Sequence, residues 1–189
     1  MNKKTLIFMI VLLAASIAVI VGYNGSREKS AASAPAAPVA FTTQDLNGGA
    51  LDQSIFTGHK LTMVNVWATY CGPCLSEMPE LGTLSKTYAD KGVQIVGVVS
   101  DVTQQSDGSY DAAALQSAQS LVKQTGADYT HLLPSKSLVS AMLTNVSAVP
   151  TTFFFDEGGR QLGKAYVGAR SQSQWAKIVD GLLAQEAAA

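Results

Sequence analysis

The feature that most constrains this chain is a pair of cysteines, Cys71 and Cys74, where a strand-like segment gives way to a helix-like one. The apolar run Leu61–Trp67 precedes the pair, and apolar residues at helical spacing follow it over residues 75–90. The first sulfur of such a pair lies at a helix N-terminus, where unpaired N–H groups and the positive end of the helix dipole favour a thiolate. The pattern therefore predicts a redox-active dithiol, with Cys71 as a nucleophile whose pKa lies below the value of about 8.5 for free cysteine.

The residues around the pair fit this chemistry. Gly72 and Pro73 separate the two cysteines, and proline is tolerated in a first helical turn because its missing N–H would have no partner there. Cys74, one turn further into the helix, is placed to attack the mixed disulfide that Cys71 forms with a partner. We therefore expect Cys71 and Cys74 to be the catalytic residues of a thiol–disulfide exchange reaction.

Two structural interpretations of the pair are weaker. A disulfide that closes so short a loop removes little chain entropy, so it would be a poor staple. A structural zinc site takes about four ligands, whereas the chain has no second cysteine pair and only two histidines, His59 and His131, far apart in sequence. We expect no metal ion at the pair, and we interpret both histidines as structural or incidental.

The N-terminal residues 1–23 predict a membrane-spanning signal anchor. Lys3 and Lys4 precede an apolar run over residues 6–22, which would span about 26 Å as a helix against a hydrocarbon core of roughly 30 Å. Positive residues ahead of the run place the N-terminus in the cytoplasm and the rest of the chain outside. A cleaved signal peptide is the competing interpretation, with a small-residue site at 32–34.

The remainder of the chain divides into a linker and one domain. Residues 24–38 are rich in Ala, Ser and Pro without periodicity, which is typical of a flexible linker. Residues 39–189 leave room for a single domain of about 145 residues with a core of its own. The net charge of −1 gives no electrostatic reason to expect nucleic acid as a partner.

Strand and helix patterns alternate first and end in an antiparallel hairpin. The expected elements are a hairpin around 41–51, strands at 61–67 and 93–99, a helix at 111–125, a strand at 129–133, a short helix at 138–143, a strand opening at 153, a returning strand at 162–167 and a closing helix at 172–184. This order predicts an α/β fold with a central mixed sheet covered by helices on both faces.

With these motifs identified, the chain resembles the thioredoxin superfamily, and within it the membrane-anchored thiol–disulfide reductases of the TlpA/ResA type. The resemblance covers about residues 39–185 and rests on Val64–Cys74, on Glu77-Met78-Pro79 and on Val149–Phe153. It implies a thioredoxin-like fold with a sheet of four or five strands, an N-terminal β-hairpin and a helical insertion over residues 100–126.

The resemblance also implies roles in substrate binding. Pro150 would be a cis-proline that lies against the cysteine pair, and the backbone of Val149 would pair with an extended substrate strand. Tyr70 stands where tryptophan is usual and would keep a flat apolar surface beside Cys71. The residues alone leave Val149-Pro150 open as an ordinary trans turn, since only about 5–6% of X–Pro bonds in folded proteins are cis.

Two further positions bear on proton transfer. Glu77 matches a carboxylate that related reductases place near the buried sulfur, although from the residues alone it would be a solvated helix residue. Asn65 stands where cytoplasmic thioredoxins carry a buried aspartate, so the proton shuttle through that aspartate is absent. Trp67 is expected in the core rather than in contact with substrate.

Together these features predict an extracytoplasmic thiol–disulfide oxidoreductase that mainly reduces disulfides of exported proteins. No bound cofactor is expected because the dithiol itself carries two electrons, and the resemblance implies a membrane electron donor of the CcdA or DsbD kind.

The alternatives are a disulfide oxidase or isomerase of secreted proteins, and a non-enzymatic metal-delivery module. A peroxidase would need a Thr and Arg constellation that is not evident near Cys71. The Pro150-Thr151-Thr152 turn lacks the Pro-Glu-Thr usual in cytochrome-maturation reductases, which counts against that assignment.

Overall fold

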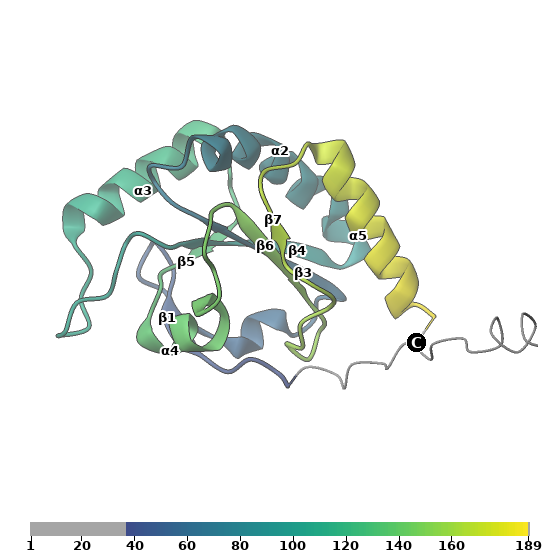
Figure 1. Cartoon of the computed structure of the whole chain (residues 1–189), viewed down its shortest axis with the longest axis horizontal. Helices are drawn as coiled ribbons and strands as arrows, with labels where there is room; N and C mark the ends of the chain where they lie inside the picture. The colour runs from purple at the N-terminus through teal and green to yellow at the C-terminus, as the bar shows by residue number, and fades with distance from the viewer. Residues whose placement is uncertain (1–36, 189) are drawn as a thin grey trace, which may run out of the picture. The chain divides into compact units, whose positions relative to one another are not determined.

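The computed structural model describes residues 37–188 and is built on a five-stranded sheet of order β5-β4-β3-β6-β7 (Figure 1). The strands are β3 (Leu61–Trp67), β4 (Val93–Val99), β5 (Thr130–Leu132), β6 (Thr151–Phe155) and β7 (Tyr166–Val167). Strands β3, β4 and β5 are parallel to one another, whereas β6 runs antiparallel to β3 and β7 antiparallel to β6. The expected mixed sheet is confirmed.

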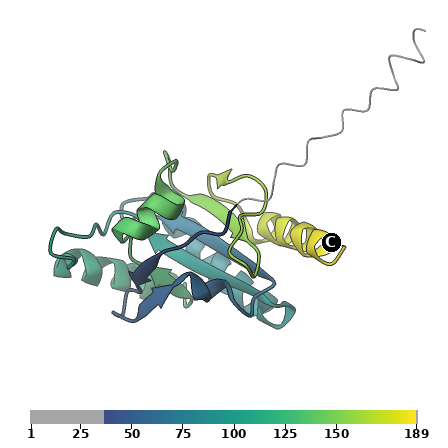
Figure 2. The same ribbon diagram turned by 90° about the horizontal axis from the view of Figure 1, so that it is seen from below.

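Helices cover both faces of this sheet (Figures 1 and 2). One face carries α2 (Gly72–Tyr88), α3 (Ala112–Thr125) and α5 (Gln172–Glu186). The other face carries the 3-10 helix η1 (Gln53–Phe56), the short helix α4 (Lys136–Leu138) and the π-helical turn η3 (Val139–Leu143). A further 3-10 turn, η2 (Ala89–Lys91), ends α2. The helix α3 lies within the insertion expected over residues 100–126.

Strand β3 forms the centre of the fold, and all seven of its residues are buried. Leu61, Met63 and Trp67 pack in the clusters that contain residues of α2 and α5 or α3, whereas Val64 and Val66 pack in the cluster on the opposite face. A strand covered on both faces has a nearly continuous run of apolar residues, so β3 could be predicted from the sequence. Asn65 is the polar exception on the face towards α2, and β3 delivers the chain directly to the cysteines.

The expected N-terminal β-hairpin is confirmed as β1 (Thr42–Gln44) paired with β2 (Ala50–Asp52). Its end joins the chain beside β5, since Leu46 N–H donates to the His131 carbonyl at 2.9 Å and Leu133 N–H donates to the Gln44 carbonyl at 2.8 Å. The hairpin therefore covers part of the β5 edge of the sheet, which would otherwise offer unpaired backbone groups.

Some boundaries differ from the expectation. The short helix expected at 138–143 starts at Lys136 and continues as η3. The returning strand expected at 162–167 is reduced to β7, residues 166–167. Gln161 bridges Phe155 and Leu162 N–H donates to the Phe154 carbonyl at 2.8 Å, so pairing with β6 begins earlier. Gly163, with φ of +66°, then turns the backbone out of the extended conformation, and the strand resumes only at β7.

The membrane anchor expected over residues 1–23 and most of the linker expected over 24–38 lie outside the described residues. Within residues 37–188, none of the helices is long and apolar enough to cross a membrane.

Candidate active site

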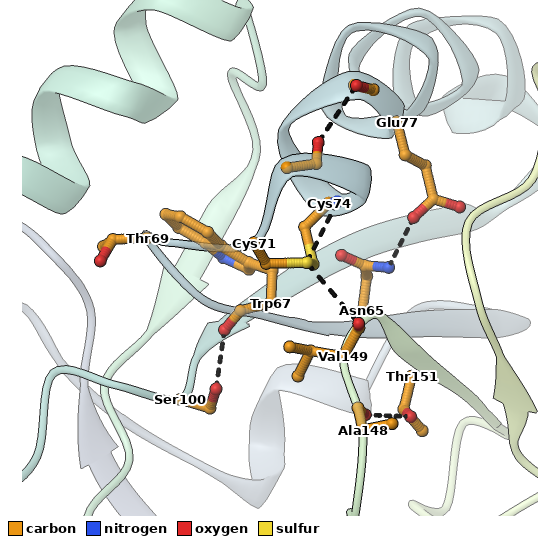
Figure 3. The surroundings of a disulfide bond; sticks show 12 residues. Asn65, Trp67, Thr69, Cys71, Cys74, Glu77, Ser100, Ala148, Val149 and Thr151 are labelled. Atoms are coloured by element: carbon orange, nitrogen blue, oxygen red, sulfur yellow. Dashed lines mark hydrogen bonds between the residues drawn. A yellow bond between two sulfur atoms is a disulfide. The ribbon is translucent and has the colours of Figure 1, made fainter.

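The cysteine pair lies where β3 ends and α2 begins, and Cys71 is the N-cap residue of α2. Its backbone is extended, and its carbonyl accepts the N–H of Leu75 at 3.1 Å. Its Sγ accepts the backbone N–H of Cys74 at 3.2 Å (Figure 3). A negative charge on this sulfur would therefore meet a backbone donor and the positive end of a helix of 17 residues.

The two sulfurs are joined as a disulfide of 2.06 Å and differ in exposure. Cys71 is 6% exposed and Cys74 only 1%. Tyr70, directly before the pair, is 78% exposed, so a partner that reaches the disulfide meets the tyrosine ring and Cys71 first. Gly72 and Pro73 form the first turn of α2, as expected.

The turn at Val149-Pro150 lies against the disulfide. The Val149–Pro150 peptide bond is cis, as the resemblance implied, and the Val149 carbonyl oxygen is 3.6 Å from Cys71 Sγ (Figure 3). Among the described residues, no acceptor pairs with the backbone N–H groups of Ser147, Ala148 or Val149. The turn thus presents free backbone groups within reach of the reactive sulfur.

A carboxylate that sequence reasoning missed holds the segment before Cys71. Asp101, just after β4, accepts the backbone N–H of Thr69 at 3.0 Å and its hydroxyl at 2.5 Å. Ser100 beside it donates both its backbone N–H and its hydroxyl to the Trp67 carbonyl, at 2.8 and 2.9 Å. Because β3 and β4 are parallel, their carboxyl ends meet at one edge of the sheet, and these contacts fix the turn that carries the disulfide.

Glu77 is buried, at 3% exposure, which excludes a solvated helix residue. Its Oε1 accepts the backbone N–H of Arg170 at 2.9 Å and the indole N–H of Trp175 at 2.5 Å, and its Oε2 accepts from the amide of Asn65 at 3.4 Å. Burial raises the pKa of the Glu77 carboxyl above its ordinary value, and the three hydrogen bonds oppose that effect. A carboxyl with these two opposed influences is suited to taking up and releasing a proton.

Two of the three donors to Glu77 could not be predicted from the sequence. Arg170 and Trp175 lie more than 90 residues further along the chain, at the start of α5 and in its first turns. Trp175 is fully buried. That its indole would meet Glu77 could not be read from helical spacing alone.

His131 is structural. Its Nδ1 accepts the indole N–H of Trp67 at 3.1 Å, which leaves Nε2 as the donor to the Ala127 carbonyl at 3.0 Å. Burial lowers the pKa of His131 to about 4, so the ring is neutral near pH 7. The ring fills the space above Gly97, where an added Cβ would lie 2.1 Å from Nδ1. Trp67 is fully buried, as expected.

No group of three or more His, Cys, Asp or Glu side chains is placed to hold a metal ion within residues 37–188. His59 precedes β3, at the opposite end of that strand from the cysteines.

A groove of about 650 Å³ opens beside Tyr70 and the Val149 turn. Of the three large apolar side chains that are exposed within the described residues, Tyr70 and Val139 line this groove, and Val167 pairs in register with Thr151, next to the cis-proline. The walls also include Val66, Pro134, Leu143, Val146 and Val149. Exposed apolar surface gathered at one place is typical of an interaction site.

The fold and this site define a class: the chain is thioredoxin-like, with a Cys-x-x-Cys disulfide at a helix N-terminus and a cis-proline turn against it. A family model described as Redoxin matches residues 29–179, and the chain belongs to that family.

Relatives and solved structures agree with this class. The chain is 27% identical over 176 residues to the thiol-disulfide oxidoreductase ResA of Halalkalibacterium halodurans, which covers 91% of this chain and 92% of that protein. It is 30% identical over 144 residues to the thiol:disulfide interchange protein HelX of Rhodobacter capsulatus, covering 76% and 67% of the two chains. A thiol:disulfide interchange protein of the thioredoxin family from Chlorobium tepidum superposes with a TM-score of 0.67 at 25% identity, covering 81% of this chain and 99% of that one.

Proposed function

We propose that this thiol–disulfide oxidoreductase works mainly as a reductase of disulfides in exported proteins, with its catalytic domain outside the cytoplasmic membrane. The observation that carries the proposal is the placement of Cys71 Sγ as the N-cap acceptor of α2, with Cys74 buried behind it. That placement gives one sulfur the environment of a thiolate and keeps the other back as a resolving thiol.

The reaction proceeds in two exchanges. The Cys71 thiolate attacks one sulfur of a partner disulfide, so the bond from Cys71 to the partner forms as the partner's S–S bond breaks and its other sulfur leaves as a thiolate that takes a proton from water. Cys74 then loses its proton and attacks Cys71 Sγ. The Cys71–Cys74 disulfide forms, the second partner sulfur leaves as a thiolate and is protonated, and two electrons have passed to the partner.

Glu77 serves as the proton acceptor for Cys74 in the second exchange. It lies one turn after Cys74 on α2, and its burial raises the pKa of its carboxyl above the ordinary value, which makes it a stronger base for the thiol proton. A carboxylate in this position takes the thiol proton as Cys74 turns nucleophile, and it releases that proton after the product leaves.

The substrate binds as an extended segment along the cis-proline turn. The free backbone N–H of Val149, whose carbonyl oxygen lies 3.6 Å from the reactive sulfur, can pair with a strand that carries the target cysteine. Pro150 offers no N–H and fixes the turn, while Tyr70 and the adjoining apolar groove receive the side chains that flank that cysteine. These residues form the substrate site of the proposal.

The direction and the partners follow from the resemblance. Gly72-Pro73 between the cysteines is similar to the reducing members of the superfamily. A dithiol that works outside the membrane must be recharged, so we propose a membrane electron donor of the CcdA or DsbD kind and an N-terminal helix that keeps the domain at the membrane. The reaction uses no bound cofactor, because the cysteine pair carries both electrons.

The reduction potential of the pair tests the direction. We expect a value of about −200 mV or lower, in the range of glutaredoxins and thioredoxin, measured by equilibration with glutathione or dithiothreitol. A potential near −120 mV, the range of a strong periplasmic oxidant, would replace the reductase by an oxidase of secreted proteins.

Trapping tests the enzymatic assignment itself. In cells, Cys74→Ser should leave substrates attached to Cys71 as mixed disulfides, and the matched variant Cys71→Ser should trap none. Tyr70→Ala should raise KM for a protein disulfide and leave the rate with a small disulfide unchanged, whereas Tyr70→Phe should behave as the wild type. An empty trap with the Cys74 variant would remove the support for a protein-disulfide substrate.

A further inference from the structure

A buried oxygen beside the disulfide has no hydrogen-bond partner. Asn65, in the middle of β3, is 1% exposed. Its amide nitrogen donates to Thr152 Oγ1 at 3.1 Å and to Glu77 Oε2 at 3.4 Å, but its amide oxygen has no partner among the described residues. A buried acceptor without a partner is rare and costly in a native core, so this atom calls for an explanation.

The orientation of the amide follows from its neighbours. The Glu77 carboxylate accepts only, so the nitrogen of Asn65 must face it and the oxygen must point the other way. In Figure 3 the nitrogen of Asn65 points towards Glu77 and the oxygen towards the side of the disulfide. In the oxidised protein neither sulfur carries a hydrogen that this oxygen could accept. Reduction creates such a donor at Cys74, which is 1% exposed.

We propose that in the reduced protein the thiol of Cys74 donates a hydrogen bond to the amide oxygen of Asn65, which makes Asn65 a positioning residue that holds Cys74 protonated and ties it to Glu77. The inference rests on the proposed function, since it takes Cys74 as the resolving thiol. The oxygen is unpaired only in the oxidised state, and it is paired in the state that attacks substrates.

The charges around Cys74 also favour its protonated form. Glu77 on α2 faces Asn65, and its negative charge disfavours a thiolate nearby. Tyr129 and His131, from the segment at β5, are uncharged near pH 7, because burial raises the pKa of the tyrosine and lowers that of the histidine. Arg170, before α5, has its charge near Glu77 rather than bonded to a sulfur. A hydrogen bond that only the protonated thiol can donate therefore adds to a surrounding that keeps Cys74 neutral while Cys71 ionises.

The S–H stretching band of the reduced full-length protein tests this contact directly. Between the pKa values of the two thiols only Cys74 carries a hydrogen, so one infrared band reports on it. We expect that band at the lower frequency of a hydrogen-bonded thiol in the wild type, and at the higher frequency of an unbonded thiol in Asn65→Leu, which has a similar volume and no oxygen. A wild-type band at the unbonded frequency would overturn the proposal without any variant.

Alkylation rates resolved by mass spectrometry give the second readout. In Asn65→Leu the pKa of Cys74 should fall by about one unit, equivalent to a tenfold change in its protonation equilibrium. Asn65→Asp keeps an oxygen towards Cys74, and its Cys74 pKa should stay at or above the wild-type value. Thr152→Val removes the other partner of the Asn65 amide but leaves the oxygen in place, and it should leave both the band and the pKa of Cys74 unchanged.

The outcomes separate this inference from the proposed function. If Asn65→Leu leaves the band and the pKa of Cys74 as in the wild type, or if Thr152→Val shifts them equally, Asn65 has only a structural role in the buried network. Disulfide reduction assayed on the same wild-type sample is independent of that result. If the wild type does not reduce disulfides, the proposed function is wrong. If it reduces disulfides but the hydrogen bond from Cys74 is absent, only the role of Asn65 is wrong.

Discussion

The exchange of Glu77 for glutamine separates the charge of this side chain from its shape. The two donors that meet Oε1, from Arg170 and Trp175, can be met equally by the amide oxygen of glutamine. Only the 3.4 Å contact with Asn65 has to rearrange. We expect Glu77→Gln to cost about 1 kcal/mol or less in unfolding free energy, whereas Glu77→Ala leaves both donors unpaired and should cost about 2–6 kcal/mol.

The same substitution removes the proton acceptor. General base catalysis contributes about 10²–10⁴-fold, so the second exchange should slow by about 100-fold or more near pH 7. The assay is the release of thionitrobenzoate from a mixed disulfide with Cys71, which reports the attack of Cys74 alone. The gap should narrow as the pH rises through the pKa of the Cys74 thiol, because the thiol then ionises without a base. Equal rates in both proteins at pH 7 would refute the catalytic role of Glu77.

Unfolding by urea across pH supplies an independent check on the same carboxyl. Because burial raises the folded-state pKa of Glu77, its contribution to stability is present in full below its unfolded value of about 4.5 and is lost as pH rises through the folded pKa. Glutamine carries no such dependence, so Glu77→Gln should gain stability relative to the wild type as pH rises through that window. An unchanged difference across the window would show that the carboxyl does not titrate there.

Three further predictions follow from the positions around the site. Because burial lowers the pKa of His131 from 6.5 to about 4, about 3 kcal/mol of stability should be lost as pH falls through that window, and urea unfolding of His131→Gln should show a correspondingly flatter pH dependence. Gly97→Ala places a Cβ 2.1 Å from the His131 ring and should cost about 1–3 kcal/mol in urea unfolding, while Gly181→Ala, with no atom within 4 Å, should be neutral or stabilising. Asp101→Ala leaves the backbone N–H and the hydroxyl of Thr69 without their acceptor, so it should lower both the melting temperature and the rate of disulfide reduction. Unchanged values would show that the contacts between Asp101 and Thr69 are dispensable.

The parts of this structure that could be predicted from sequence are local ones. A buried strand that runs into a helix places its junction residue as an N-cap, so the environment of Cys71 follows from a few neighbouring residues. The cis state of Pro150 and the place of Glu77 near the buried sulfur were implied by the resemblance, whereas the residues themselves favoured a trans turn and a solvated carboxyl. The structure has Pro150 cis and Glu77 buried, and the roles assigned to these residues remain proposals.

The contacts that could not be predicted join residues that are distant in the chain. The hydrogen bonds between Thr69 and Asp101, between Trp175 and Glu77 and between Trp67 and His131 span 32 to 98 positions. No periodic pattern encodes which side chain lies opposite which across a sheet or under a helix. The shortened strand β7 is a different case, because Gly163 could have indicated a break in the strand.

The central claim is that Cys71 ionises at the start of α2 while Cys74 stays protonated behind it. The most direct measurement is the rate of iodoacetamide alkylation of each thiol in the reduced protein, resolved by peptide mass spectrometry from pH 4 to pH 10. Cys71 should react with an apparent pKa well below about 8.5, and Cys74 should lag at every pH up to that value. Two thiols that react equally slowly, each titrating as free cysteine does, would contradict it.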